Sequence, residues 1–165
     1  MSQHRASRSR RRGSSDVPSL CVSVPRTVRF EEVDAVRFMW HGRYASWLED
    51  GREVMGRAYG VSYLDFRNSG VVVPLKLFHL DFHHPLLYGQ TYTIHAELFW
   101  NEAAVLDFEY HIEDAAGLVT TTASTTQLML DLDGNLLISN DCFDGIKICD
   151  KLIMWNIINT CTETR

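Results

Sequence analysis

The stretch from Val33 to Tyr44 combines residue types that could act on a carbonyl group. Asp34 is a carboxylate that can attack a carbonyl carbon or activate a water molecule. His41 follows seven residues later and Tyr44 ten residues later, directly before a segment with helical periodicity. The first N–H groups of a helix are unpaired and lie at the positive end of its dipole. We therefore predict that the backbone amide of His41 or Gly42 stabilises a developing oxyanion beside Asp34.

A long helix is predicted directly after these residues. Apolar residues recur at helical spacing from Tyr44 to Tyr59, with charged residues between them, which indicates an amphipathic helix of about four turns. Gly60 is placed to end it. Gly51 and Gly56 lie inside the helix, where glycine is unfavourable, so we expect close packing against a sheet. Residues 31–43 have no clear period and are predicted to form a loop.

The remainder of the pattern is typical of β-strands. In residues 105–113 apolar and polar side chains alternate, so one face of the sheet is covered and the other faces water. A single helix on a curved antiparallel β-sheet is an α+β fold, and the uncovered part of the sheet predicts an oligomer. Strands are expected at residues 24–30, 76–82, 91–100, 105–113, 118–130 and, after an Asp133-Gly134 turn, 136–138.

Length and charge indicate one domain with a basic tail. The chain has 165 residues, enough for one core and too few for two ordinary domains. Residues 1–22 are interpreted as a disordered basic tail, rather than a nucleic-acid-binding or targeting segment, residues 23–139 as the folded domain and residues 140–165 as an extension of unknown structure. Outside the arginines of the tail, acidic residues outnumber basic ones, so we expect no nucleic acid partner.

The cysteine and hydropathy patterns indicate the cellular compartment in which the protein is expected. None of the four cysteines forms a CxxC motif, which favours a reducing, cytoplasmic compartment over a disulfide framework or zinc knuckle. No apolar run is long enough for a membrane span, so no membrane association is expected.

The loop and helix resemble the 4-hydroxybenzoyl-CoA thioesterase family of the hot-dog superfamily. That family carries an aspartate after its first strand, a His or Tyr seven residues later and a Tyr ten residues later, matched here by Asp34, His41 and Tyr44. Residues 47–53 resemble the family's helix, and residues 80–85 and 88–90 its next strand and turn. The resemblance implies a hot-dog fold and an acyl-CoA thioesterase.

The resemblance also implies roles for individual residues. Asp34 is the expected catalytic carboxylate, as nucleophile or general base, with His41 as a second catalytic residue. Arg37 departs from the family, which usually has a glycine there; it either alters the pocket or supplies a cation for coenzyme A phosphates. The residues expected to bind substrate are Gly42, Tyr44, Arg37 and His83.

The implied partner is an acyl-CoA or acyl carrier protein thioester, acted on by a homodimer or homotetramer. We expect no cofactor and no metal, although His79, Asp81 and His83 alternate along one strand and could share a metal. Two alternatives remain open: a non-catalytic hot-dog protein that binds acyl groups or coenzyme A, and a polyketide-associated thioesterase.

Overall fold

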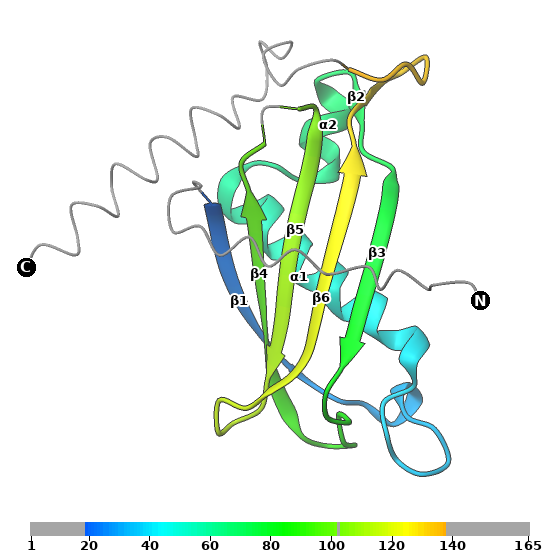
Figure 1. Cartoon of the computed structure of the whole chain (residues 1–165), viewed down its shortest axis with the longest axis vertical. Coiled ribbons are helices and arrows are strands. Elements are labelled where there is room, and N and C mark those ends of the chain that lie inside the picture. The colour runs from blue at the N-terminus through cyan, green and yellow to red at the C-terminus, as the bar shows by residue number, and fades with distance from the viewer. Residues whose placement is uncertain (1–18, 102, 138–165) are drawn as a thin grey trace, which may run out of the picture.

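The computed structural model describes residues 19–101 and 103–137. Five strands form one antiparallel sheet in the order β1-β4-β5-β6-β3, and β2 pairs with β7 outside it. One long helix crosses this sheet (Figure 1), which confirms the predicted α+β fold. The elements are β1 (Ser19–Thr27), η1 (Phe30–Glu32), η2 (His41–Arg43), α1 (Tyr44–Tyr59), α2 (Tyr63–Asn68), β2 (Val71–Val72), β3 (Leu75–Phe82), β4 (Thr91–Phe99), β5 (Val105–Glu113), β6 (Val119–Leu128) and β7 (Leu130–Asp131).

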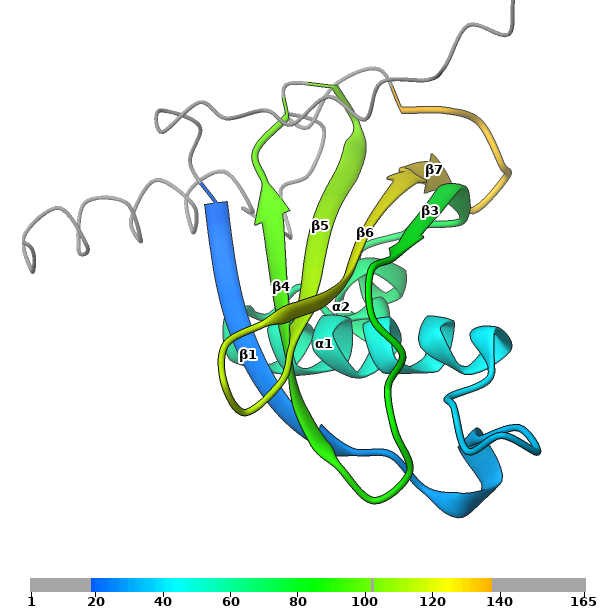
Figure 2. The same ribbon diagram turned by 60° about the horizontal axis from the view of Figure 1, so that its bottom comes forward.

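Helix α1 lies against one face of the sheet, and the strands bend around it (Figure 2). Its buried residues include Trp47 and Met55, on the side that contacts β1 and β4. Gly51 permits this approach, because an added Cβ would come within 3.2 Å of the Ala96 Cβ on β4. The helix ends at Gly60, whose φ of 65° is left-handed, as predicted for a C-terminal glycine.

Gly56 serves a different contact from the predicted one. An added Cβ would lie 2.8 Å from the Cα of Ser62, so Gly56 packs against the turn after α1 rather than against the sheet. Ser62 then caps α2: its hydroxyl accepts the Asp65 N–H at 3.2 Å, and the Asp65 carboxylate accepts the Ser62 N–H at 2.8 Å. Our prediction of strands alone after Gly60 missed this short helix.

Alternation along the strands gives the sheet two different faces. On β5, Leu106, Phe108 and Ile112 are buried on the inner face, which is the face that α1 covers. His111 and Glu113 point to the opposite, outer face and are only partly buried. The predicted alternation of this strand is confirmed.

Strand β3 is a sheet edge with little cover. Leu75, Leu77 and Phe82 are 52%, 59% and 53% exposed. In the described part of the chain, β3 pairs only with β6, so the backbone groups on its other side meet no strand. This edge is both apolar and open to strand pairing.

Several strand boundaries differ from those predicted, and two of the differences are substantial. Strand β1 begins at Ser19 rather than near Val24, so regular structure reaches into the segment interpreted as a tail. The Asp133-Gly134 turn forms, but the strand before it is the short β7, and Leu136 makes only a single bridge with Leu130. Residues 1–18 of the tail and the extension at 140–165 lie outside the described residues. Neither described α-helix has the length and apolar character of a membrane span.

Candidate active site

The loop between η1 and η2 holds Asp34 in a tight turn. Its Oδ1 accepts the N–H groups of Val36 at 2.9 Å and Phe38 at 3.2 Å, and its C=O accepts the Arg37 N–H at 3.0 Å. An aspartate that bonds its own following backbone in this way is a stable turn former. Asp34 is exposed, and its Oδ2 has no hydrogen-bond partner among the residues described. One carboxylate oxygen is therefore open to substrate or water.

Arg37 occupies a strained position at the end of this turn. It is the one non-glycine residue in the described ranges with positive φ, at 66°. Such a backbone costs an L-residue roughly 1–2 kcal/mol and glycine almost nothing. The position at which the resembling family carries glycine thus has the backbone conformation that glycine favours, and Arg37 adopts it with its side chain exposed.

Backbone hydrogen bonds fix the loop against the connection between β3 and β4. The Met39 N–H donates to the Leu86 C=O at 2.8 Å, and the Tyr88 N–H donates to the Arg37 C=O at 3.3 Å. Arg37 and Met39, the two neighbours of Phe38, are therefore both hydrogen-bonded to this connection.

A buried network, which the sequence analysis missed, holds the base of the loop. Glu32 is 4% exposed, and its Oε1 accepts Arg26 Nη2 at 2.9 Å and Trp47 Nε1 at 3.0 Å. Its Oε2 accepts the Arg29 N–H at 2.9 Å, and Arg26 also pairs with Asp50 on α1. Burial alone raises the pKa of Glu32, but these donors outweigh burial and hold the pKa below its ordinary value of 4.5. The network joins β1, the loop and α1.

The start of the helical segment presents open N–H groups. Helix η2 runs directly into α1, and neither the His41 nor the Gly42 backbone N–H donates to an acceptor within the part of the chain that the structure describes. Trp40, 49% exposed, lies beside both residues: its ring centroid is 5.0 Å from that of His41, and a side chain at Gly42 would overlap it. Trp40 was not among the predicted site residues.

Tyr44 directly follows η2 but its side chain is buried, and His83 lies elsewhere, after β3. Tyr44 is 3% exposed and packs edge-to-face against Phe82 with centroids 4.8 Å apart, while burial raises the pKa of its phenol. His83 follows β3, and its Nε2 lies 3.0 Å from Thr122 Oγ1 on the outer face. The Tyr44 side chain thus packs in the core beneath the start of α1. His83 contacts the outer face of the sheet, opposite α1. Of the predicted residues, His41 and Gly42 are in η2 and Tyr44 begins α1, whereas Asp34 and Arg37 are in the preceding loop.

A cavity of about 430 Å³ lies farther along α1, between α1, α2 and the inner face. None of the predicted site residues lines it. Arg52 lines it, with its guanidinium 4.6 Å from the Tyr63 ring centroid and 5.2 Å from that of Phe108, and pairs with Glu49 at 3.0 Å. The predicted catalytic carboxylate and this cavity are therefore separate within one chain.

Comparison with protein families gives one clear match. The model of the Thioesterase-like superfamily matches residues 28–149, which include the Asp34 turn, α1 and all of the sheet except β1. The protein YneP of Bacillus subtilis (strain 168), provisionally named an acyl-CoA thioesterase, is 28% identical over 104 residues, covering 63% of this chain and 75% of that protein.

Solved structures share the fold. A hypothetical protein from Thermus thermophilus matches with a TM-score of 0.69 and 21% identity, over 82% of this chain and 97% of that one. The DHNA-CoA thioesterase of Staphylococcus aureus matches with a TM-score of 0.67 and 18% identity, over 88% of this chain and 93% of that one. These matches confirm the predicted hot-dog fold.

Proposed function

We propose that this chain, which belongs to the thioesterase-like superfamily and is a thioester hydrolase, cleaves acyl-coenzyme A thioesters with Asp34 as its reactive carboxylate. One observation carries the assignment: an exposed carboxylate oxygen lies on a hydrogen-bonded turn in the loop before η2, and η2 has two open N–H groups. Thioester hydrolysis needs a nucleophile or base at the carbonyl carbon and donors at the carbonyl oxygen.

Asp34 acts through its free Oδ2. The two N–H bonds to Oδ1 orient the carboxylate. The charged oxygen either attacks the thioester carbon, giving an anhydride that water then cleaves, or removes a proton from an attacking water. Both routes require the same exposed, ionised group and release the free acid and the thiol.

The developing oxyanion is stabilised at the helix start. The N–H groups of His41 and Gly42 lie at the positive end of the dipole of α1, where negative charge is favoured. The absence of a side chain at Gly42 leaves room for the Trp40 ring, which gives the acyl group or the thiol an aromatic surface. The His41 imidazole beside it orients the substrate, and the exposed Arg37 supplies positive charge for coenzyme A phosphates.

A second copy of the chain completes the site. Helix α1 contacts β1 and β4 but leaves apolar residues of β3 exposed. A single chain therefore does not enclose a substrate site at the β3 edge. Pairing of β3 with β3 of another copy would cover Leu75, Leu77 and Phe82 and satisfy the open backbone groups of the edge. A homodimer is therefore the functional unit that we propose.

Hydrolysis of a panel of short, long and aromatic acyl-CoA substrates, followed by thiol detection, tests the role of Asp34. We expect Asp34→Asn to lower turnover at least about a hundredfold, because a positioned catalytic group is lost. The amide oxygen of Asn can still accept both N–H bonds, so the turn is kept. Asp114→Asn is a matched control: Asp114 Oδ1 accepts the N–H groups of Ala116 at 2.8 Å and Leu118 at 2.9 Å, the same pattern in a hairpin turn.

Two outcomes would contradict the proposal. Equal turnover in Asp34→Asn, Asp114→Asn and the unmodified chain would remove Asp34 from the reaction. An unmodified chain that binds coenzyme A but releases no thiol from any substrate would favour the non-catalytic binding protein.

A further inference from the structure

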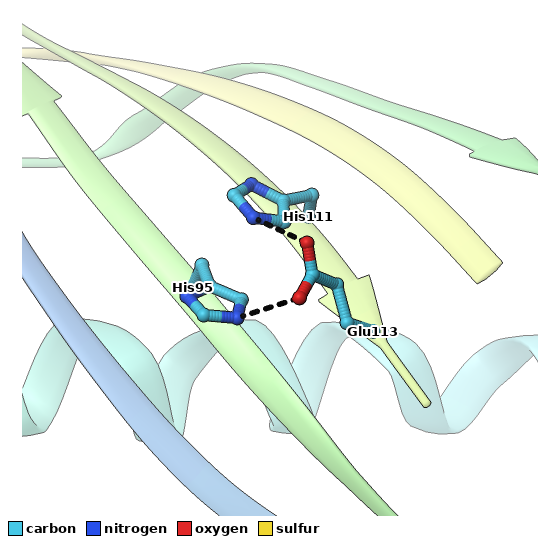
Figure 3. Close-up of side chains that lie close together, drawn as sticks. All are labelled: His95, His111 and Glu113. Carbon is cyan, nitrogen blue, oxygen red and sulfur yellow. Dashed lines mark ion pairs between the residues drawn. The ribbon is translucent and has the colours of Figure 1, made fainter. Parts of the chain in front are cut away.

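Two histidines and a glutamate converge on the outer face of the sheet, away from α1 (Figure 3). His95 on β4 and His111 on β5 are directly opposite each other in the antiparallel pair. Their rings stack with centroids 4.4 Å apart and planes 11° apart. Glu113 lies two residues after His111 and therefore on the same face, with its carboxylate between the two imidazoles.

The two distances from the histidines to Glu113 suit a metal ion, and the three ligand atoms all lie within 4.8 Å of one another. His95 Nε2 lies 3.4 Å from Glu113 Oε2, and His111 Nε2 lies 3.3 Å from Glu113 Oε1. Ligands about 2.0–2.1 Å from a tetrahedral zinc ion are about 3.3 Å from one another. His95 Nε2 is also buried without a hydrogen-bond partner, since its approach to Glu113 lacks hydrogen-bond geometry. We propose that His95, His111 and Glu113 bind a divalent transition-metal ion, with Zn²⁺ as the preferred ion.

Ser23 supports this assignment from a third strand. Its hydroxyl lies 2.8 Å from His95 Nδ1, and it is the residue paired with His95 across β1 and β4. With the proton on Nδ1 donated to Ser23, the lone pair of His95 is on Nε2, which faces Glu113. Metal-binding histidines commonly have their other ring nitrogen held in this way.

The surrounding charge attracts a cation. The outer-face positions of β1, β4 and β5 carry no Lys or Arg, but they carry the carboxylates of Glu97, Asp107, Glu109 and Glu113. Two imidazoles and one carboxylate suit zinc and related transition metals, whereas Mg²⁺ and Ca²⁺ prefer oxygen ligands alone. A fourth position remains for water. The torsion that turns each imidazole is soft, and both rings must turn out of their stacked orientation for the two Nε2 lone pairs to converge on one ion.

The ion would link β4 and β5, which carry its ligands, and through Ser23 also β1. It lies on the face of the sheet opposite α1 and uses none of the residues proposed for hydrolysis, so the inference does not rest on the proposed hydrolase mechanism.

Cobalt and zinc titrations of the full chain, stripped of metal with a chelator, test the proposal. We expect Co²⁺ to give the visible absorption bands of a four-coordinate nitrogen and oxygen site, and Zn²⁺ to abolish them. His95→Gln, His111→Gln and Glu113→Gln should each weaken binding at least about tenfold, and Ser23→Ala about tenfold as a supporting residue. Thiolate ligation gives an intense near-ultraviolet band instead, which distinguishes binding at cysteines.

His79→Gln is the matched control. His79 Nε2 lies 2.9 Å from Asp81 Oδ2 in an exposed pair on another strand, with no third ligand beside it among the described residues. We expect the affinity of His79→Gln for Co²⁺ and Zn²⁺ to equal that of the unmodified chain. Circular dichroism of the metal-free variants checks folding, and Glu113→Gln keeps the side-chain shape if a histidine variant unfolds. Equal affinity in the unmodified chain and in His95→Gln, or an equal loss in His79→Gln, would overturn the proposal.

Discussion

Replacement of Glu32 tests whether its buried network holds the base of the loop that carries Asp34. Glu32→Ala removes a carboxylate that accepts three hydrogen bonds, from Arg26, Trp47 and the Arg29 backbone. Breaking a buried charge pair costs up to about 3–5 kcal/mol when the remaining partner stays uncompensated, and the pair that Arg26 keeps with Asp50 lowers this cost. Glu32→Gln keeps the shape, but its NH₂ group must face one of the three donors. The loss of one such bond costs about 1–3 kcal/mol.

Glu31→Gln provides the matched control, since it makes the same chemical change one residue away. Glu31 is 59% exposed and lies 3.6 Å from Arg29, and exposed pairs contribute about 0–1 kcal/mol. Urea unfolding at neutral pH gives the free energy of unfolding of each variant. If Glu32→Gln is no less stable than Glu31→Gln, the network does not hold the loop as we describe.

The pH dependence of the same variants gives a second measurement. The pKa of Glu32 in the folded chain is below its ordinary value of 4.5, so folding favours the charged form. Its stabilising contribution is therefore complete above about pH 4.5 and is lost as the pH falls through the folded-state pKa. The stability difference between the unmodified chain and Glu32→Gln should shrink in that acidic range. A difference that grows on acidification would refute the assigned direction.

Two further predictions concern the loop and the sheet edge. In urea unfolding, Arg37→Gly should be more stable than Arg37→Ala by about 1 kcal/mol. Both variants lose the arginine side chain, but only Ala keeps a Cβ in the left-handed backbone. Equal stabilities of the two variants would contradict this. Leu77→Lys on β3 should weaken dimer formation at least about tenfold in sedimentation experiments, since burial of one leucine contributes about 1.5–3 kcal/mol. Leu64→Lys, at a residue 69% exposed on α2, should leave the mass unchanged, and an equal effect of both would exclude β3 as the interface.

Features determined by neighbouring residues could be predicted from the sequence. Helix α1 was predicted at Tyr44–Tyr59 with Gly60 as its end, because side-chain periodicity and a C-terminal glycine are local properties. Strand β5 was predicted because the alternation of its apolar and polar side chains is also a local property. Helix α2 also had a local signal, the Ser62 and Asp65 capping pair, but its six residues are too short to show periodicity.

Features that depend on strand register could not be predicted. Glu32 is buried only because Arg26 on β1 and Trp47 on α1 meet it, and nothing near Glu32 in the sequence indicates this. Similarly, His95 and His111 lie opposite each other only because β4 and β5 pair in this particular register. A shift of one residue would turn one histidine to the inner face.

The strained backbone of Arg37 and the Asp34 carboxylate belong to one structural unit. Left-handed backbone persists where the surroundings fix it, and here the Asp34 C=O holds the Arg37 N–H while the Tyr88 N–H holds the Arg37 C=O. We therefore expect the side chain and the backbone at this position to affect different steps. Arg37→Ala and Arg37→Gly both remove the charge, but only Gly relieves the backbone. A rise in KM shared by both variants would identify Arg37 as a cation for coenzyme A, whereas a difference in kcat between them would identify the turn as the element that positions Asp34.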